Sequence, residues 1–274
     1  MDLTYFNKKD IVIIGCGKMG SALLSGWIDS GIDLKNITVI EPNPSPWLRK
    51  KNVRLNKELP KKPVLVLIAI KPQMMSTVIP KLKAFGSSNT VFVSIAAGTS
   101  ISYFSKILGD KTPIVRAMPN TPSSIGKGIT AIIPNDYVKK SQLKEVEALL
   151  SSVGKTVLLD FEQDLDAVTA VSGSGPAYVF HLIEALASAG EARGLGAELS
   201  MSLAKATVSG AGALAEISEL EPSALRVNVT SPGGTTEAAL KILMDKKIGL
   251  ESLLEKAVKA ATKRSRELKE LDDE

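Results

Sequence analysis

The sequence is poor in the residues on which much enzyme chemistry depends. Its 274 residues include one cysteine and one histidine, and aromatic side chains make up 4% of the chain. One cysteine cannot form an internal disulfide, which fits a reducing compartment. One cysteine and one histidine cannot supply a zinc site, so we expect no bound metal. A serine nucleophile elbow is also missing, because Gly173-Ser174-Gly175 lacks the strand-to-helix flanks of that motif.

Long apolar runs and a secretory signal are absent as well. No apolar stretch approaches the ~20 residues of a bilayer-spanning helix, and the first ten residues lack the apolar segment of a signal peptide. The net charge is +5, and residues 49–62 alone carry seven cations against one anion. A nucleic-acid-binding face would spread its cations and interleave aromatic side chains. We therefore expect a cytoplasmic protein that binds neither membranes nor nucleic acid, with residues 49–62 as a solvated loop.

The most informative motif is Gly15-Cys16-Gly17-Lys18-Met19-Gly20, which directly follows the apolar run 11–14. The first glycine allows a tight turn, the second lets backbone N–H groups approach a pyrophosphate, and the third lets a helix pack on the strand. An amphipathic stretch at 22–28 and a strand candidate at 37–40 supply the expected context. The motif predicts a dinucleotide site; the alternative is a plain glycine turn. In the first case, residues 49–62 would lie near the adenosine end.

The chain divides into two halves of different character. Before residue 160 strands alternate with helices, which favours an α/β fold with a doubly wound sheet, and after residue 162 only helical patterns remain. The predicted domains are 1–161 and 162–274. We expect strands at 11–14, 37–40, 64–70, 91–96, 114–116, 129–133 and 156–159. We expect helices at 73–84, 101–108, 139–153, 177–190, 198–219, 237–244 and 250–271. Helix 198–219 is rich in small residues and gains most when other helices surround it, which a second subunit could provide.

Glycine- and proline-rich loops follow the predicted strands and precede two of the predicted helices. Loops 71–73, 96–99 and 118–122 follow strands, where open α/β sheets bind their ligands. Loops 172–176 and 231–236 precede helices, and their hydroxyl and free N–H groups suit a small carboxylate. Helix capping is the alternative for each loop. Two such loops beside a dinucleotide turn favour a substrate site.

Acid–base groups are scarce in the helical half. We interpret His181 as a packing residue of helix 177–190, because its neighbours Phe180 and Leu182 are apolar. Cys16 is interpreted as packed rather than nucleophilic. A dinucleotide enzyme with so few proton donors suits hydride addition to a C=N bond, because a protonated imine is already electrophilic. A ketone reductase more often places a His, Lys or Tyr donor beside its substrate.

Six motifs, in order, resemble those of pyrroline-5-carboxylate reductases. They span nearly the whole chain: residues 14–20, 68–73, 94–98, 116–122, 171–178 and 229–236. The stretch 225–240 resembles the signature of that family. The resemblance implies reduction of L-1-pyrroline-5-carboxylate to L-proline by NADPH or NADH, the last step of proline biosynthesis. It also implies a Rossmann domain followed by a helical dimerisation domain. Homodimers are implied, often gathered into decameric rings of five dimers, with each active site built from both subunits.

The resemblance further implies roles for individual residues. The implied cofactor-binding residues are Gly15, Gly17, Lys18, Met19, Gly20, Ala69, Ile70, Lys71, Pro72, Ala97, Met118, Asn120, Thr121 and Pro122. The implied substrate-binding residues are Asn228, Ser231, Gly234, Thr235 and Thr236, of which Thr236 would hydrogen-bond the ring nitrogen as the catalytic residue.

The ribose end of the cofactor site departs from the family pattern. Glu41 ends the second predicted strand, and an acid there typically binds a ribose 2′-hydroxyl, which favours NADH. Asn43 and the nearby basic side chains of residues 49–51 instead suit a 2′-phosphate. The family and the basic segment favour NADPH, with NADH as the alternative. Alternative functions are a related imine reductase, a β-hydroxyacid dehydrogenase-like oxidoreductase, or a dinucleotide sensor without activity.

Overall fold

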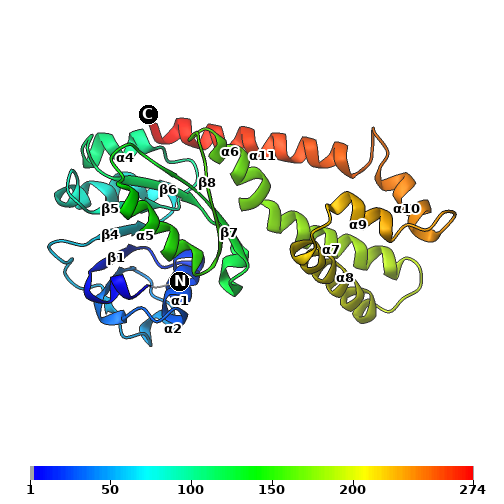
Figure 1. The fold of residues 1–274 in the computed structure, drawn as a ribbon, viewed down its shortest axis with the longest axis horizontal. Coiled ribbons are helices and arrows are strands. Elements are labelled where there is room, and N and C mark those ends of the chain that lie inside the picture. Colours follow the sequence, from blue (N-terminus) through cyan, green and yellow to red (C-terminus); the bar gives the residue numbers. More distant parts are fainter. Residues whose placement is uncertain (1–2, 274) are drawn as a thin grey trace. The chain divides into compact units, whose positions relative to one another are not determined.

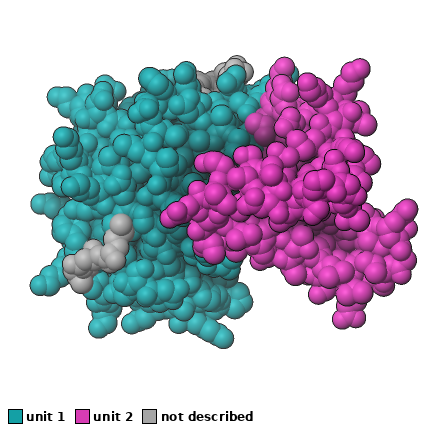
Figure 2. Space-filling model, turned by 45° about the vertical axis from the view of Figure 1, so that its right-hand side comes forward, with its two compact units in different colours: residues 1–173, 261–274 teal, residues 174–260 magenta. Residues whose placement is uncertain are grey.

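The computed structural model describes residues 3–273 and contains two compact units. Unit 1 comprises Met1–Gly173 and Ala261–Glu274, and unit 2 comprises Ser174–Ala260. Figure 1 shows the ribbon, and Figure 2 colours the two units. The elements of each unit are therefore best described separately. Among the described residues, no helix combines the length and apolar character required to cross a bilayer.

Unit 1 is built on one eight-stranded sheet of order β3-β2-β1-β4-β5-β6-β7-β8. The strand bounds are β1 (Ile11–Ile14), β2 (Ile37–Ile40), β3 (Arg54–Leu55), β4 (Leu65–Ile68), β5 (Val91–Ser94), β6 (Ile114–Met118), β7 (Gly128–Pro134) and β8 (Gly154–Leu158). The pair β6 and β7 is antiparallel and the other neighbours are parallel. The strand order reverses between β1 and β4, which is where such sheets bind dinucleotides.

Both faces of the sheet are covered, as the continuously apolar strands require. In β1, Ile11 and Ile13 belong to one buried cluster, whereas Val12 and Ile14 belong to another. The first cluster includes Trp27, whose indole N–H donates to the carbonyl oxygen of Leu149 at 3.0 Å. These side chains alternate between faces because successive strand residues point in opposite directions. The sheet thereby fixes the positions of the loops at its carboxyl edge.

Short helices connect the strands of unit 1 (Figure 1). The α-helices are α1 (Lys18–Asp29), α2 (Pro46–Arg49), α3 (Met75–Val78), α4 (Ile101–Leu108), α5 (Lys140–Ser151) and α6 (Asp164–Val168). The described residues of unit 1 also contain 3-10 segments, the first of which precedes β1: η1 (Thr4–Lys8), η2 (Leu34–Asn36), η3 (Pro72–Met74), η4 (Ile79–Phe85) and η5 (Thr121–Ile125). A π-helical turn, η6 (Thr169–Gly173), ends the first stretch of unit 1. Such turns are frequent at functional sites.

Unit 2 consists of helices that bury few of their side chains. Its helices are α7 (Gly175–Glu191), α8 (Ala197–Ile217), α9 (Pro222–Asn228), α10 (Thr235–Leu243) and the start of α11 (Leu250–Asp273). Of residues 174–260, the buried ones are small: Ala187, Ser200, Ala204 and Gly249. Large apolar side chains such as Phe180 and Ile242 remain 59% and 70% exposed. Unit 2 therefore lacks a core of its own among these residues.

Most of the expected elements are present, and three expectations fail. The single helix expected at 73–84 is instead the series η3, α3 and η4, because Pro80 has no backbone N–H to continue an α-helix. Strand β3 was not expected, since its two residues are too few to show a period. Within the single chain His181 is not packed: its side chain is 82% exposed and its Nδ1 lies 3.1 Å from Glu184 Oε2.

Candidate active site

The turn after β1 has the geometry of a phosphate-binding loop. Gly15 adopts φ +88°, and a Cβ there would lie 2.6 Å from the carbonyl oxygen of Ala69. A Cβ on Gly20 would lie 2.7 Å from the carbonyl oxygen of Gly15, so this glycine lets α1 pack closely. A Cβ on Gly17 would meet nothing within 4 Å. Gly17 and Lys18 are exposed at the start of α1, so a ligand phosphate can approach the helix N-terminus there.

Glu41, which follows β2, has its carboxylate fixed beside this turn. Its Oε2 accepts a hydrogen bond from the backbone N–H of Cys16 at 2.8 Å, and its Oε1 accepts one from Asn43 N–H at 2.9 Å. Asn56 exchanges two further hydrogen bonds with the Glu41 backbone, at 2.8 and 2.9 Å. Both carboxylate oxygens are therefore directed by the backbone. The carboxylate lies where the order of β1 and β2 predicts the ribose of a dinucleotide.

The thiol of Cys16 is part of the same turn but is poorly suited to reaction. The side chain is buried, and its Sγ lies 3.5 Å from Ser21 Oγ. Burial raises the pKa of the Cys16 thiol, and the neighbouring Glu41 charge raises it further. The thiolate is the nucleophilic form, so a raised pKa makes the side chain less reactive. The interpretation of Cys16 as a packing residue agrees with this environment.

Further predicted cofactor residues follow β4 at the same edge of the sheet. Ala69 N–H donates to the Ile14 carbonyl at 2.8 Å, which holds the chain after β4 against the end of β1. Ile70 and Pro72 are partly exposed, and Lys71 is exposed. Ala69 and Ile70 lie next to the glycine turn, because a Cβ on Gly15 would meet the Ala69 carbonyl oxygen at 2.6 Å and Ile70 Cγ2 at 2.8 Å.

Loops after β5 and β6 complete this edge. Ala97 is partly exposed within the otherwise buried stretch 96–100. Asn120, which follows β6, accepts a hydrogen bond from Ile129 N–H at 2.9 Å and donates to Ser172 Oγ at 3.3 Å. Thr121 and Pro122 begin η5. The amide of Asn120 thus links the loop after β6 to the π-helical turn.

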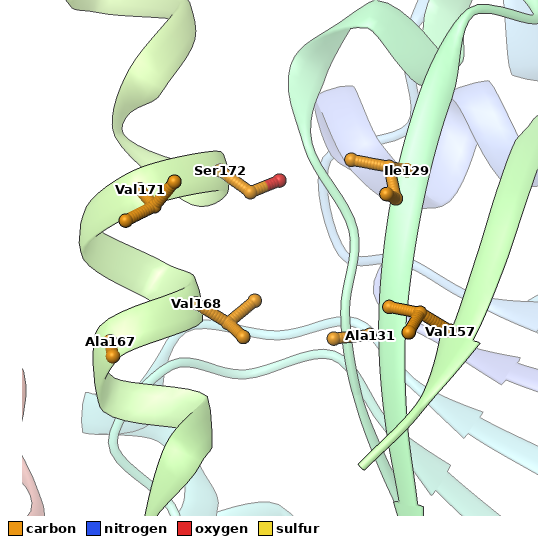
Figure 3. A pocket seen from close by; sticks show the side chains of 7 residues that line it. All are labelled: Ile129, Ala131, Val157, Ala167, Val168, Val171 and Ser172. Carbon is orange, nitrogen blue, oxygen red and sulfur yellow. The ribbon is translucent and has the colours of Figure 1, made fainter. Parts of the chain in front are cut away.

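An apolar hollow of about 300 Å³ lies beside this link (Figure 3). Its lining residues come from β7, β8, α6 and η6, and they are Ile129, Ala131, Val157, Ala167, Val168, Val171 and Ser172. None of them carries a charge, so the hollow is unsuited to phosphate or carboxylate. Ser172 supplies the hydroxyl of the lining, and that hydroxyl accepts the Asn120 hydrogen bond.

In unit 2 the predicted carboxylate loop forms a tight turn before α10. Gly234 N–H donates to the Ser231 carbonyl at 3.0 Å, and Gly234 is the N-cap residue of α10. Gly233 has φ +70° and donates its N–H to Glu237 Oε2 at 2.6 Å. Thr235 and Thr236 occupy the first turn of the helix, where backbone N–H groups lack intrahelical partners. The loop therefore offers donors to an anion, although Glu237 already uses one of them.

Asn228 is the last residue of α9. It is exposed, as are Ser231 and Thr235. Between α9 and the loop, Thr230 donates its hydroxyl to the Arg226 carbonyl at 2.7 Å and its N–H to the Val227 carbonyl at 3.0 Å. Among the described residues, no hydrogen bond joins the Asn228 side chain to the loop, so the support expected from Asn228 stays a prediction.

Comparisons with known proteins agree with this architecture. The family model described as pyrroline-5-carboxylate reductase dimerisation matches residues 162–268. The model described as NADP oxidoreductase, coenzyme F420-dependent, matches residues 10–98. A pyrroline-5-carboxylate reductase of Pseudomonas aeruginosa is 39% identical over 266 residues, which cover 95% of this chain and 97% of that protein. The chain belongs to the pyrroline-5-carboxylate reductase family.

Solved structures of the pyrroline-5-carboxylate reductase family have the same fold. The structure of the Coxiella burnetii reductase is 36% identical with a TM-score of 0.89, and the match covers 96% of this chain and 99% of that one. The structure of the Plasmodium falciparum reductase, solved with NADP bound, is 29% identical with a TM-score of 0.85 over 96% and 99% of the chains. The expectation of a Rossmann-type domain followed by a helical dimerisation domain is confirmed.

Two residues of this site region were not singled out from the sequence. Arg116, within one of the family-like motifs, and Glu162, after β8, form an ion pair beside the loop that contains Ala97. The two residues lie 46 positions apart in the sequence, so neither a helical or strand period nor the spacing of a motif relates them. Their proximity comes from the sheet order and could not have been anticipated from local patterns.

Proposed function

We infer that the protein reduces L-1-pyrroline-5-carboxylate to L-proline with a reduced nicotinamide cofactor, the last step of proline biosynthesis. The observation that carries this inference is the end-to-end match to reductases of this family, with the glycine turn of unit 1 and the carboxylate-type loop of unit 2 both present. The protein is thus an oxidoreductase that acts on a CH–NH group.

The residues of unit 1 fit a nicotinamide dinucleotide. The open space at Gly17 would receive the pyrophosphate, and Glu41 and Asn43 lie where a ribose is expected. Ala69, Ile70, Lys71 and Pro72 would line the second ribose, and Ala97 would contact the nicotinamide. When bound in reduced form, the cofactor supplies a hydride to the C=N carbon. Met118, Asn120, Thr121 and Pro122 would shape the adjoining pocket and exclude water from it.

The loop before α10 is proposed to hold the substrate carboxylate. Ser231, Gly234 and Thr235 would donate hydrogen bonds to that group, with Asn228 supporting the loop. The hydroxyl of Thr236 would accept a hydrogen bond from the protonated ring nitrogen and so orient the imine. Positioning of this kind accounts for catalysis without a histidine or lysine donor, because the protonated imine needs no further activation.

NADPH is proposed as the preferred reductant, with NADH as the second candidate. The NADP-bound relative from Plasmodium falciparum and the exposed Arg49 and Lys50 support NADPH. The fixed carboxylate of Glu41 favours NADH. Ratios of kcat/KM for the two cofactors, measured at one substrate concentration, decide between them.

The protein is further proposed to act as a cytoplasmic homodimer, with a decamer of such dimers as the second candidate assembly. The match to a dimerisation model and the exposed apolar side chains of unit 2 support self-association. We propose 1–161 as the cofactor-binding domain and 162–274 as the substrate-binding and dimerisation domain. Light scattering after size-exclusion chromatography measures the assembly, and a monomer at micromolar concentration would contradict it.

Oxidation of NADPH or NADH at 340 nm with pyrroline-5-carboxylate tests the function itself. The expected result is substrate-dependent oxidation with L-proline as product. Activity with other cyclic imines but not with this substrate would favour a related imine reductase, and activity with hydroxy acids would favour a dehydrogenase. Cofactor binding without turnover of any of these substrates would favour a sensor.

A further inference from the structure

Glu162 joins two elements that border the loop after β5. Its Oε1 accepts a hydrogen bond from Arg116 Nη1 at 2.6 Å and a second from the backbone N–H of Ile101 at 2.8 Å. Ile101 is the first residue of α4, and Arg116 lies in β6. The Arg116 side chain is 7% exposed and that of Glu162 is 28% exposed. One carboxylate oxygen therefore connects a nearly buried cation to the start of a helix.

The same contacts mark the two ends of the loop 95–100. Ser94, the last residue of β5, is the cross-strand partner of Arg116. The loop leaves the sheet at Ser94 and ends where Ile101 donates to Glu162. The Arg116–Glu162 pair thus closes a ring of contacts, which runs from Ser94 through the loop to Ile101 and returns through Glu162 and Arg116 to β5. Ala97, which is partly exposed, lies within this ring.

Other contacts also hold the loop inside the ring: Ile95 N–H donates to the Ile68 carbonyl at 3.1 Å, and Ala96 N–H donates to Ser94 Oγ at 3.3 Å. Gly98 has φ +80°, a conformation that favours glycine, and the side chain of Ser100 caps α4 by accepting from Tyr103 N–H at 3.0 Å. Capping fixes the helix start locally, whereas Glu162 ties that start to the sheet. Removing Glu162 would leave Arg116 as a buried cation without its partner, which is strongly unfavourable. Arg116 would then be drawn towards solvent, and the loop beside it would shift.

We propose that Arg116 and Glu162 are positioning residues for the loop 95–100. They fix the backbone around Ala97, and thereby set how tightly the nicotinamide end of the cofactor is bound and how well it is aligned. This inference rests on the proposed function, because it assumes that a nicotinamide dinucleotide occupies the carboxyl edge of the sheet. It assigns an effect on cofactor affinity and turnover to two side chains that need not touch the cofactor.

Three variants separate the contributions of the pair. Glu162→Ala removes both hydrogen bonds. Glu162→Gln keeps a carbonyl oxygen for Ile101 N–H but loses the charge that pairs with Arg116. Arg116→Lys keeps the cation but loses the planar fork that reaches the carboxylate. Asp10→Ala is the matched control, because it breaks the Arg54–Asp10 ion pair, whose Asp10 precedes β1 at the opposite edge of the sheet.

The primary readout is the dissociation constant of NADPH and NADH, from the fluorescence of the reduced ring without substrate. We expect about a tenfold weaker affinity for Glu162→Ala and a smaller loss for Glu162→Gln and Arg116→Lys, because small misplacements of positioning groups are costly. kcat should fall in the same order, while KM for the imine at saturating cofactor changes little. Asp10→Ala should lower the melting temperature and leave the dissociation constants unchanged.

A purely structural pair would give a different pattern. If all three variants lose thermal stability but bind both cofactors within twofold of the parent, the proposal is wrong. If Glu162→Ala does not fold, Glu162→Gln and Arg116→Lys carry the test alone with the same criterion. Failure of the parent protein to bind either cofactor would instead refute the proposed function.

Discussion

Replacement of Glu41 by alanine should raise the ratio of kcat/KM for NADPH to that for NADH. Both oxygens of the Glu41 carboxylate accept backbone hydrogen bonds, from Cys16 and Asn43. The side chain therefore cannot rotate away from a 2′-phosphate without losing these bonds. Alanine removes a repulsion that acts on NADPH alone and a hydrogen-bond acceptor that serves the 2′-hydroxyl of NADH alone. The two effects change the ratio in the same direction.

The size of the shift follows from the charge. Two unit charges 4–8 Å apart interact by about 2–4 kcal/mol at an effective dielectric constant of 20. Glu41 is partly exposed, so solvent reduces this interaction, and we expect about 1.4 kcal/mol, which corresponds to a tenfold change in the ratio. Loosening of the turn at Cys16 would weaken both cofactors alike and cancels in the ratio.

The assay compares initial rates with the two cofactors for the parent, Glu41→Ala and Glu58→Ala. Glu58 is exposed, lies in the same basic segment and carries the same charge, so its variant controls for the change in net charge. Dissociation constants measured without substrate provide a second readout. A ratio for Glu41→Ala within twofold of the parent, or an equal shift in Glu58→Ala, would refute the reasoning.

Three further predictions concern single residues of the proposed site. Gly17→Ala should fold normally but bind cofactor at least about tenfold more weakly, since its Cβ meets no protein atom yet occupies the space for phosphate. Gly20→Ala should instead lower the melting temperature, because its Cβ would lie 2.7 Å from the Gly15 carbonyl oxygen. Equal melting temperatures for the two variants would contradict this contrast. Thr236→Ala should lower kcat by about tenfold or more without changing cofactor affinity, and unchanged turnover and KM would remove Thr236 from the mechanism. Burial raises the pKa of the Cys16 thiol, so iodoacetamide labelling, followed by mass spectrometry, should be slower than for an unfolded control at pH 8 and should accelerate only as the pH rises towards that raised value. Equal rates would show that the thiol is accessible and ionised.

Local patterns predicted the elements of unit 1 wherever a single physical rule dominated. Strands β1 and β2 match their predicted bounds because each is a run of four β-branched residues, and isoleucine, valine and threonine favour strands. Helix α4 matches because Ser100 caps it and Gly109 ends it with φ +107°. The segment 73–84 was harder, since its apolar period is helical but Pro80 interrupts the backbone hydrogen bonds. The apolar period favoured an α-helix there and the proline opposed it, and no local pattern decides which of the two effects dominates.

The candidate site was predictable where glycine geometry defines it. The roles assigned to Gly15 and Gly20 include steric limits, and a Cβ at either position would meet a backbone oxygen within 2.7 Å, whereas the phosphate-binding role of Gly17 stays a prediction. The hydrogen bonds of Glu41 and the contact between Arg116 and Glu162 were not predictable, because they join residues 25 and 46 positions apart in sequence. Such contacts follow from the order of the strands, which appears only after the sheet has formed.

The helical half shows most clearly what a sequence pattern leaves open. Helices α7 and α8 were predicted from their periods, but their large apolar side chains, including Phe180, Leu199 and Leu203, remain 49–59% exposed. A single chain buries mainly small residues along these helices, and small residues contribute little apolar area each. In the proposed homo-oligomer, apolar surface covered between subunits would supply much of the free energy that keeps unit 2 folded, in line with the match to a dimerisation model. It follows that the stability of this half should rise with protein concentration, whereas the sheet of unit 1, with its own buried clusters, should be far less sensitive.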